Sequence, residues 1–181
     1  MNARVISTNL ARPETLDYGG KKARTGIYKE PFAGTILLEA EGVRDDLIAD
    51  RRVHGGIKKA VYAYPSEHYP WWREKLGREQ LPWGTFGENL TTTGIDELAV
   101  HKGDRFRIGT ALIEATKPRL PCWKFGAKLG TNDAIRWMME SETFGIYFAV
   151  IEPGEVRAGD MIERLSTNPD APTIRAMADA A

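Results

Sequence analysis

Short runs of β-forming residues separated by glycine and proline dominate this chain. They lie at residues 5–7, 35–38, 60–64, 89–92, 105–108, 111–115 and 146–150. The stretch Ile-Gly-Thr-Ala at residues 108–111 is typical of a hairpin tip between two of these runs. Many short strands with this punctuation favour a closed sheet. The sequence therefore predicts a mainly β fold of the α+β kind, a β-barrel with flanking helices.

Three helices are expected beside the strands. Residues 66–76 and 131–142 show apolar side chains at three- and four-residue spacing, as an amphipathic helix does. Residues 122–129 predict a shorter helix. Gly77 and Gly130 follow two of these segments directly, and glycine is the residue that most often ends a helix.

Length and composition limit the class of protein. The chain has 181 residues, which fits one domain, placed at residues 1–165 with a polar tail at 166–181 that forms at most one marginal helix. Lys and Arg total 25, as do Asp and Glu, so no global field attracts nucleic acid or anionic membranes. No apolar run resembles a leader or reaches membrane-spanning length, and a single cysteine suits a reducing compartment. These features predict a cytoplasmic protein.

The only cysteine, Cys122, lies in a basic stretch with the sequence KPRLPCWKF. Pro121 precedes it, which places the thiol at or near the start of the short helix. A helix start and the cations Lys117, Arg119 and Lys124 would stabilise a thiolate, the form that acts as nucleophile and soft-metal ligand. The alternative is structural, because a reduced cysteine is often a buried core residue. Local context alone leaves both interpretations open.

The histidines bear on what Cys122 can do. His54, His68 and His101 lie far apart in the sequence and show no paired zinc-ligand spacing. A metal bound to Cys122 would therefore need most of its ligands from elsewhere, for example from an organic cofactor that carries its own donors. A cysteine protease would need a histidine base, for which spacing leaves His54 and His101 open, but the surroundings match no protease signature.

Two further segments are candidates for ligand binding. Residues 50–59 combine Arg51, His54, Gly55 and Gly56 with two lysines, and glycine-rich backbone beside cations can hold a phosphate. A solvated charged turn is the alternative. Residues 86–90 contain adjacent Glu88 and Asn89, which can hydrogen-bond to a heterocycle or serve only to form a turn.

Taken in order, these segments resemble the MOSC domain, named for the carboxy-terminal domain of molybdenum-cofactor sulfurases. The resemblance rests on four motifs in sequence: HGG at residues 54–56, FGENL at 86–90, GDRFRIG at 103–109 and PRLPC at 118–122. It covers roughly residues 4–165 and is greatest for stand-alone bacterial YiiM-like proteins. Asp45 departs from the pattern, since a glycine is expected there. YiiM-like proteins also often continue into a three-helix extension beyond the region matched here.

The resemblance implies a β-barrel fold, a molybdopterin-type molybdenum cofactor and a metal-ligating cysteine at the position of Cys122. It implies that Arg51, His54, Gly55 and Gly56 face the cofactor, as do Glu88, Asn89 and Arg119, and that His54 or a bound water supplies a proton. Pyridoxal phosphate binding is a further property that the resemblance to this family implies.

The function that the resemblance implies is reduction of small N-hydroxylated compounds, such as hydroxylamines and hydroxylated base analogues, to amines. Electrons would come from a separate reductase, because the chain shows no flavin, haem or iron–sulfur signature. Two alternatives stay open. The domain can be a non-catalytic carrier of the cofactor or of cysteine-bound sulfur, or a barrel in which Cys122 only fills space.

Overall fold

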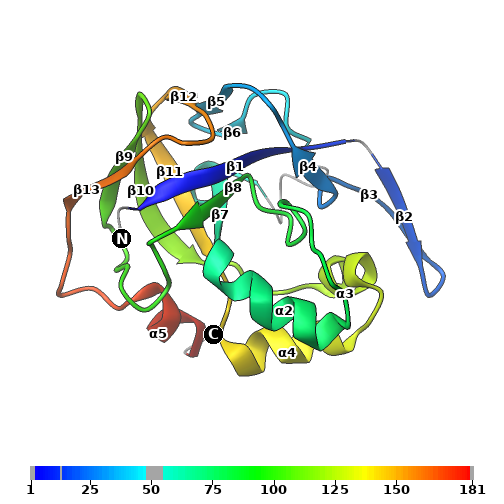
Figure 1. Cartoon of the computed structure of the whole chain (residues 1–181). Helices are drawn as coiled ribbons and strands as arrows, with labels where there is room; N and C mark the ends of the chain where they lie inside the picture. The colour runs from blue at the N-terminus through cyan, green and yellow to red at the C-terminus, as the bar shows by residue number, and fades with distance from the viewer. Residues whose placement is uncertain (1–2, 13, 48–54, 180–181) are drawn as a thin grey trace.

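The computed structural model describes residues 3–12, 14–47 and 55–179, and its largest element in these ranges is an eight-stranded sheet (Figure 1). The strand order is β13-β9-β10-β11-β7-β8-β1-β4, and each neighbouring pair is antiparallel except β7 and β8. The strands are β1 (Arg4–Ala11), β4 (Lys29–Pro31), β7 (Val61–Pro65), β8 (Leu90–Thr93), β9 (Arg105–Ile108), β10 (Ala111–Pro118), β11 (Ile146–Glu152) and β13 (Ile162–Ser166). The hairpin predicted at residues 108–111 is confirmed, since it joins β9 to β10.

Two small sheets accompany the large one. One contains β12 (Gly154–Val156), β5 (Ile36–Glu39) and β6 (Gly42–Val43). The other is the hairpin of β2 (Glu14–Tyr18) and β3 (Lys21–Thr25), which projects from the body of the molecule in Figure 1.

The mainly β prediction is confirmed, but the expected closed barrel is not found among the described residues. The large sheet has two edges, β13 and β4, and between the start of β1 and the chain before β13 there is an isolated bridge, Arg4 to Met161, with no paired ladder of strands. The reason is local. Beside the start of β1 lies the turn at residues 159–160, which exchanges backbone hydrogen bonds with Val5. A turn therefore occupies the place where a closing ladder would need a strand.

Helices cover one side of the sheet: α2 (Tyr69–Leu76), α3 (Trp123–Leu129), α4 (Asp133–Ser141) and α5 (Ile174–Asp179). The expected terminators are confirmed, because Gly77 and Gly130 both adopt left-handed backbone conformations at helix C-termini. The helix predicted at residues 66–76 is divided, with a 3-10 turn, η2 (Ser66–His68), before α2. Pro70 explains this, since it has no amide hydrogen to donate to the Ser66 carbonyl, and Tyr69 donates there instead.

The segment beyond residue 165 is packed more tightly than a polar tail would be. Ile174 on α5 is fully buried and belongs to the main hydrophobic cluster, while its amide donates to the Val100 carbonyl. None of the described helices is long and apolar enough to cross a membrane.

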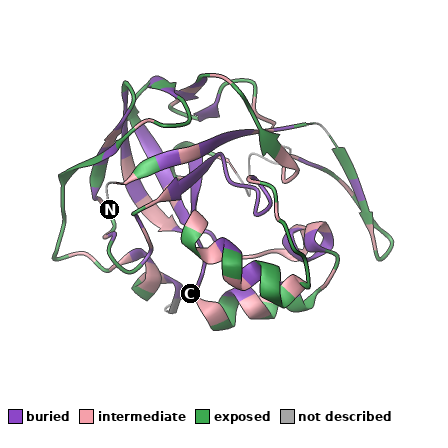
Figure 2. Cartoon of the chain, viewed as in Figure 1, coloured by how far each residue is buried: buried purple, intermediate pink, exposed green. Residues whose placement is uncertain are grey.

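The core has two parts. Figure 2 shows the buried residues in purple; one cluster of them is mainly aliphatic and the other is mainly aromatic. In the aromatic part the Trp72 indole donates to the Tyr64 hydroxyl at 2.7 Å, so both polar groups are satisfied. Phe86 and Phe125 complete this cluster and are fully buried. They anchor the 84–89 loop and α3, two segments that contribute residues to the pocket described next.

Candidate functional site

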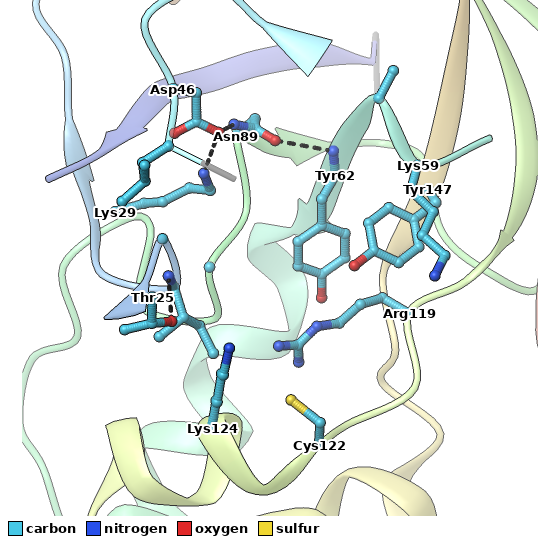
Figure 3. Close-up of a pocket in the computed structure, with 15 residues that line it drawn as sticks. Thr25, Lys29, Asp46, Lys59, Tyr62, Asn89, Arg119, Cys122, Lys124 and Tyr147 are labelled. Carbon is cyan, nitrogen blue, oxygen red and sulfur yellow. Dashed lines mark hydrogen bonds and ion pairs between the residues drawn. The ribbon is translucent and has the colours of Figure 1, made fainter. Parts of the chain in front are cut away.

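A pocket opens where β7, β11 and the start of α3 meet several connecting segments of the chain (Figure 3). Cations and polar groups predominate among its longer side chains, and Asp46 is its one carboxylate among the described residues. The residues that line it are Thr25, Gly26, Ile27, Lys29, Asp46, Leu47, Lys59, Ala60, Tyr62, Gly87, Asn89, Arg119, Cys122, Lys124 and Tyr147. Of the predicted site residues, the structure thus brings Cys122, Arg119 and Asn89 together.

Cys122 is the residue that immediately precedes α3. Its backbone is extended, with φ of −130° and ψ of 173°, and its carbonyl accepts the amide of Phe125 at 2.9 Å. The side chain is half-buried and faces the pocket in Figure 3. The thiol is therefore not core filler: the chain turns into the helix at this point and leaves the sulfur on the pocket wall.

Arg119 is a buried cation on the same wall. Only 7% of its surface is exposed, and its Nη1 makes no hydrogen bond within the described part of the chain. The guanidinium lies 5.5 Å from the ring centre of Tyr62 and 4.9 Å from that of Phe125. Burial disfavours its charge, but Tyr62, Tyr147 and Cys122 more than offset this and raise the pKa of Arg119. A permanently charged donor without a partner is a site for an anionic ligand.

Lys29 and Asp46 form a buried ion pair on the side of the pocket away from Cys122 (Figure 3). Asp46 also accepts the Ala11 amide at 2.7 Å and the Asn89 side-chain amide at 2.8 Å. Burial lowers the pKa of Lys29, although Asp46 acts in the opposite direction. Asp45, where the family pattern led us to expect glycine, has φ of 64° and so keeps the left-handed turn that presents Asp46.

Glu88 lies beneath the pocket and does not line it. Its carboxylate accepts the amides of Gly84 at 2.8 Å and Phe86 at 3.0 Å, the Thr91 hydroxyl at 2.9 Å, and the Tyr69 hydroxyl. These bonds use the acceptor capacity of a fully buried carboxylate. Glu88 therefore shapes the 84–88 loop, whereas its neighbour Asn89 reaches the pocket.

The predicted basic loop is only partly described. Arg51 and His54 lie outside the described residues. Gly55 and Gly56 precede the 3-10 helix η1 (Ile57–Lys59), and neither is among the residues that line the pocket.

Lys59, at the end of η1, does line the pocket. Burial, together with repulsion from Lys59 and Lys58, lowers the pKa of the nearby Lys117. Such mutual repulsion among lysines indicates a region of positive potential at this side of the pocket.

Several lining residues were not predicted as site residues. Lys29, Asp46, Tyr62 and Tyr147 belong to segments that read as ordinary turns and strands. The one available signal was a tyrosine, with its polar hydroxyl, within each of two strand-like runs. In the structure Tyr62 and Tyr147 lie opposite each other on paired strands, with ring centres 5.2 Å apart. Only tertiary contact brings them to the pocket.

Comparison with known proteins agrees with this arrangement. The chain is 43% identical over 162 residues to the YflK protein of Bacillus subtilis, covering 90% of this chain and 73% of that one. A protein of Gibberella moniliformis named "Reductase" is 32% identical over 149 residues, which cover 81% of this chain but only 26% of the fungal one.

A solved structure is similar over almost the whole chain. The crystal structure of YiiM from Geobacillus stearothermophilus superposes with a TM-score of 0.81 and 30% identity, covering 97% of this chain and 82% of that one. The family model described as "MOSC domain" matches residues 50–163, a range that contains Asn89, Arg119 and Cys122. The chain therefore belongs to the MOSC domain family.

Proposed function

We propose that this chain is a molybdenum-cofactor-dependent oxidoreductase that reduces N-hydroxylated compounds to amines. One observation carries the proposal: the Cys122 thiol and the unpartnered Nη1 of the buried Arg119 belong to the same cationic pocket. A thiolate is a soft-metal ligand, and a guanidinium N–H group without a partner can recognise an anion. A molybdopterin-type cofactor combines a soft metal with an anionic group, so the side chains fit it.

The pocket suggests which residues would hold the cofactor. Cys122 would complete the metal ligation, which suits a metal that arrives with its other donors, because the described residues contain no cluster of three His, Cys, Asp or Glu side chains. Arg119, Lys59 and Lys124 would bind anionic oxygens. Asn89 already bonds to Asp46 and to the Tyr62 amide, so its orientation is set before any ligand enters.

When bound, the cofactor would supply two-electron redox chemistry at molybdenum. The net reaction takes an N–OH compound, two electrons and two protons, and yields an amine and water. The electrons would come from a separate reductase. The Lys29–Asp46 pair can hold a proton at the Lys29 ammonium within the pocket. Tyr62 and Tyr147 form an aromatic wall that limits the access of water. The redox name of the fungal relative supports this reaction class.

The test compares wild type with Cys122→Ser, both produced in a host that synthesises the cofactor. We expect wild type to contain molybdenum and Cys122→Ser to lose most of it, because serine is a poor soft-metal ligand. Metal is measured by elemental analysis, and turnover by amine formation from a hydroxylamine with a chemical electron donor. Equal molybdenum in both proteins would refute the ligand assignment. Bound molybdenum without amine formation would instead support a carrier.

A further inference from the structure

Lys128 connects separate segments around the pocket. It lies on α3, the helix that begins after Cys122, and its Nζ donates to the carbonyl oxygens of Ile27 and Gly84, both at 2.7 Å. Ile27 lines the pocket, and Gly84 begins the loop that leads to Gly87, which also lines it. One side chain thus joins the cysteine-bearing wall to two others.

The two carbonyls that Lys128 contacts each close a backbone turn. The Gly84 oxygen also accepts the Gly87 amide at 3.0 Å, and the Ile27 oxygen accepts the Lys29 amide at 3.1 Å. A carbonyl oxygen has two lone pairs, so Lys128 takes the second acceptor site of each. Without the ammonium, both turns would keep only their internal hydrogen bond.

The segments that Lys128 bridges pack closely against each other at two glycines. A Cβ atom added at Gly84 would lie 2.6 Å from the Lys29 oxygen, and one added at Gly87 would lie 3.0 Å from Cγ1 of Ile27. No side chain of Gly84 or Gly87 is available to lock this contact. Lys128 of α3 instead forms hydrogen bonds to both segments.

Glu88 and Lys128 hold the same loop from two directions. The Glu88 carboxylate accepts the Gly84 amide, whereas Lys128 donates to the Gly84 carbonyl. The peptide groups on both sides of this residue are therefore bonded to the fully buried Glu88 carboxylate and to the half-buried Lys128 side chain, which are of opposite charge.

Neighbouring groups act in opposite directions on the pKa of Lys128. Burial, together with repulsion from Lys29 and Arg119, lowers the pKa of Lys128 to about 7, although Glu88 and Glu14 oppose the shift. The Tyr28 ring, 5.6 Å from Nζ, packs against the ammonium. Either protonation state can maintain the bridge, because a neutral amine has two N–H donors and there are two carbonyls.

We propose that Lys128 is a positioning residue that clamps Ile27 and Gly84 to α3 and so pre-sets the pocket walls around Cys122. The clamp itself can be tested in the ligand-free protein. Its benefit for ligand retention rests on the proposed function.

The first experiment measures amide hydrogen exchange in wild type, Lys128→Met and Lys128→Arg, with the exposed Lys75→Met as matched control. We expect the Gly87 and Lys29 amides to exchange about tenfold faster in Lys128→Met, with the β9–β10 hairpin unchanged. Lys128→Arg, which keeps the charge and donors, should recover part of the protection. Uniformly faster exchange, or no change at Gly87 and Lys29, would overturn the proposal.

A second measurement uses pH. The pKa of Lys128 is lowered in the folded state, so the unfolded chain binds more protons between pH 7 and about 10.5, the ordinary lysine value. The contribution of Lys128 to stability therefore rises with pH in that window. Lys128→Met should be more destabilising at pH 9 than at pH 6. The control Lys75→Met should have the same small effect on stability at both pH values. A pH-independent effect of Lys128→Met would contradict an enclosed, bridging amine.

A third measurement is molybdenum content after production in a cofactor-synthesising host. Lys128→Met should retain less molybdenum than Lys75→Met. Equal retention would show that Lys128 does not contribute to ligand binding. If wild type itself takes up no molybdenum, the proposed function fails, while hydrogen exchange still decides whether Lys128 positions the walls.

Discussion

The buried ion pair between Lys29 and Asp46 offers a sharp test of how the pocket is stabilised. The two side chains are 7% and 3% exposed, so neither charge is compensated by water. The substitution Lys29→Met removes the cation and keeps similar volume. It leaves Asp46 buried, with the Ala11 amide and the Asn89 side-chain amide as its remaining donors.

The expected loss follows from these contacts. Removing one partner of a buried pair typically costs about 3–5 kcal/mol. Because two donors to Asp46 remain, we expect the lower end of the range, roughly 3 kcal/mol. For a chain of this length each kcal/mol lowers the melting temperature by about 2–4 °C, so Lys29→Met should melt roughly 6–12 °C below wild type.

The assay is urea denaturation together with thermal melting, and the chain contains a matched control. Arg136 and Glu140 form an ion pair in which both side chains are more than half exposed, so Glu140→Gln should change stability by no more than about 0.5 kcal/mol. The double variant Lys29→Met/Asp46→Asn should recover stability relative to Lys29→Met alone, since no charge is left buried and the side-chain oxygen at position 46 can still accept the Ala11 amide. If Lys29→Met is as mild as Glu140→Gln, the reasoning is wrong.

Two further predictions concern packing. Gly84→Ala should be more destabilising than Gly19→Ala by about 1–3 kcal/mol. Both residues have positive φ, but only the Cβ atom added at Gly84 would clash with backbone atoms. Equal urea midpoints for the two variants would contradict this. Ile174→Ala should cost about 2–5 kcal/mol, because the side chain is fully buried on α5. Met139→Ala, at a side chain that is 44% exposed, should change the unfolding free energy by about 0.5 kcal/mol or less. Similar losses for the two would show that α5 is not part of the core.

Local features of the chain were predictable because they depend on neighbours in the sequence. The β9–β10 hairpin follows from a two-residue turn between apolar runs, and helix ends at Gly77 and Gly130 follow from the backbone freedom of glycine. The short helix after Cys122 was expected for the same reason, and so was the mainly β class. The ordered motifs also sufficed for the MOSC family, which the family model confirms.

Other features required the tertiary structure, because they join residues far apart in the chain. No local pattern could show that a turn at residues 159–160 lies beside β1 and keeps the sheet open. Nor could it show that the Glu88 carboxylate bonds to the amides of its own loop, while Asn89 reaches the pocket.

The sequence by itself determined which chemical groups are available, a single thiol among cations, since composition and spacing are properties of the chain. Only the tertiary structure decided which of them share one space. It left Cys122 beside a buried Arg119 with an unpartnered donor, and it paired Lys29 with Asp46. The physical reason is that burial and charge compensation depend on contacts across the whole fold, which residue order does not specify.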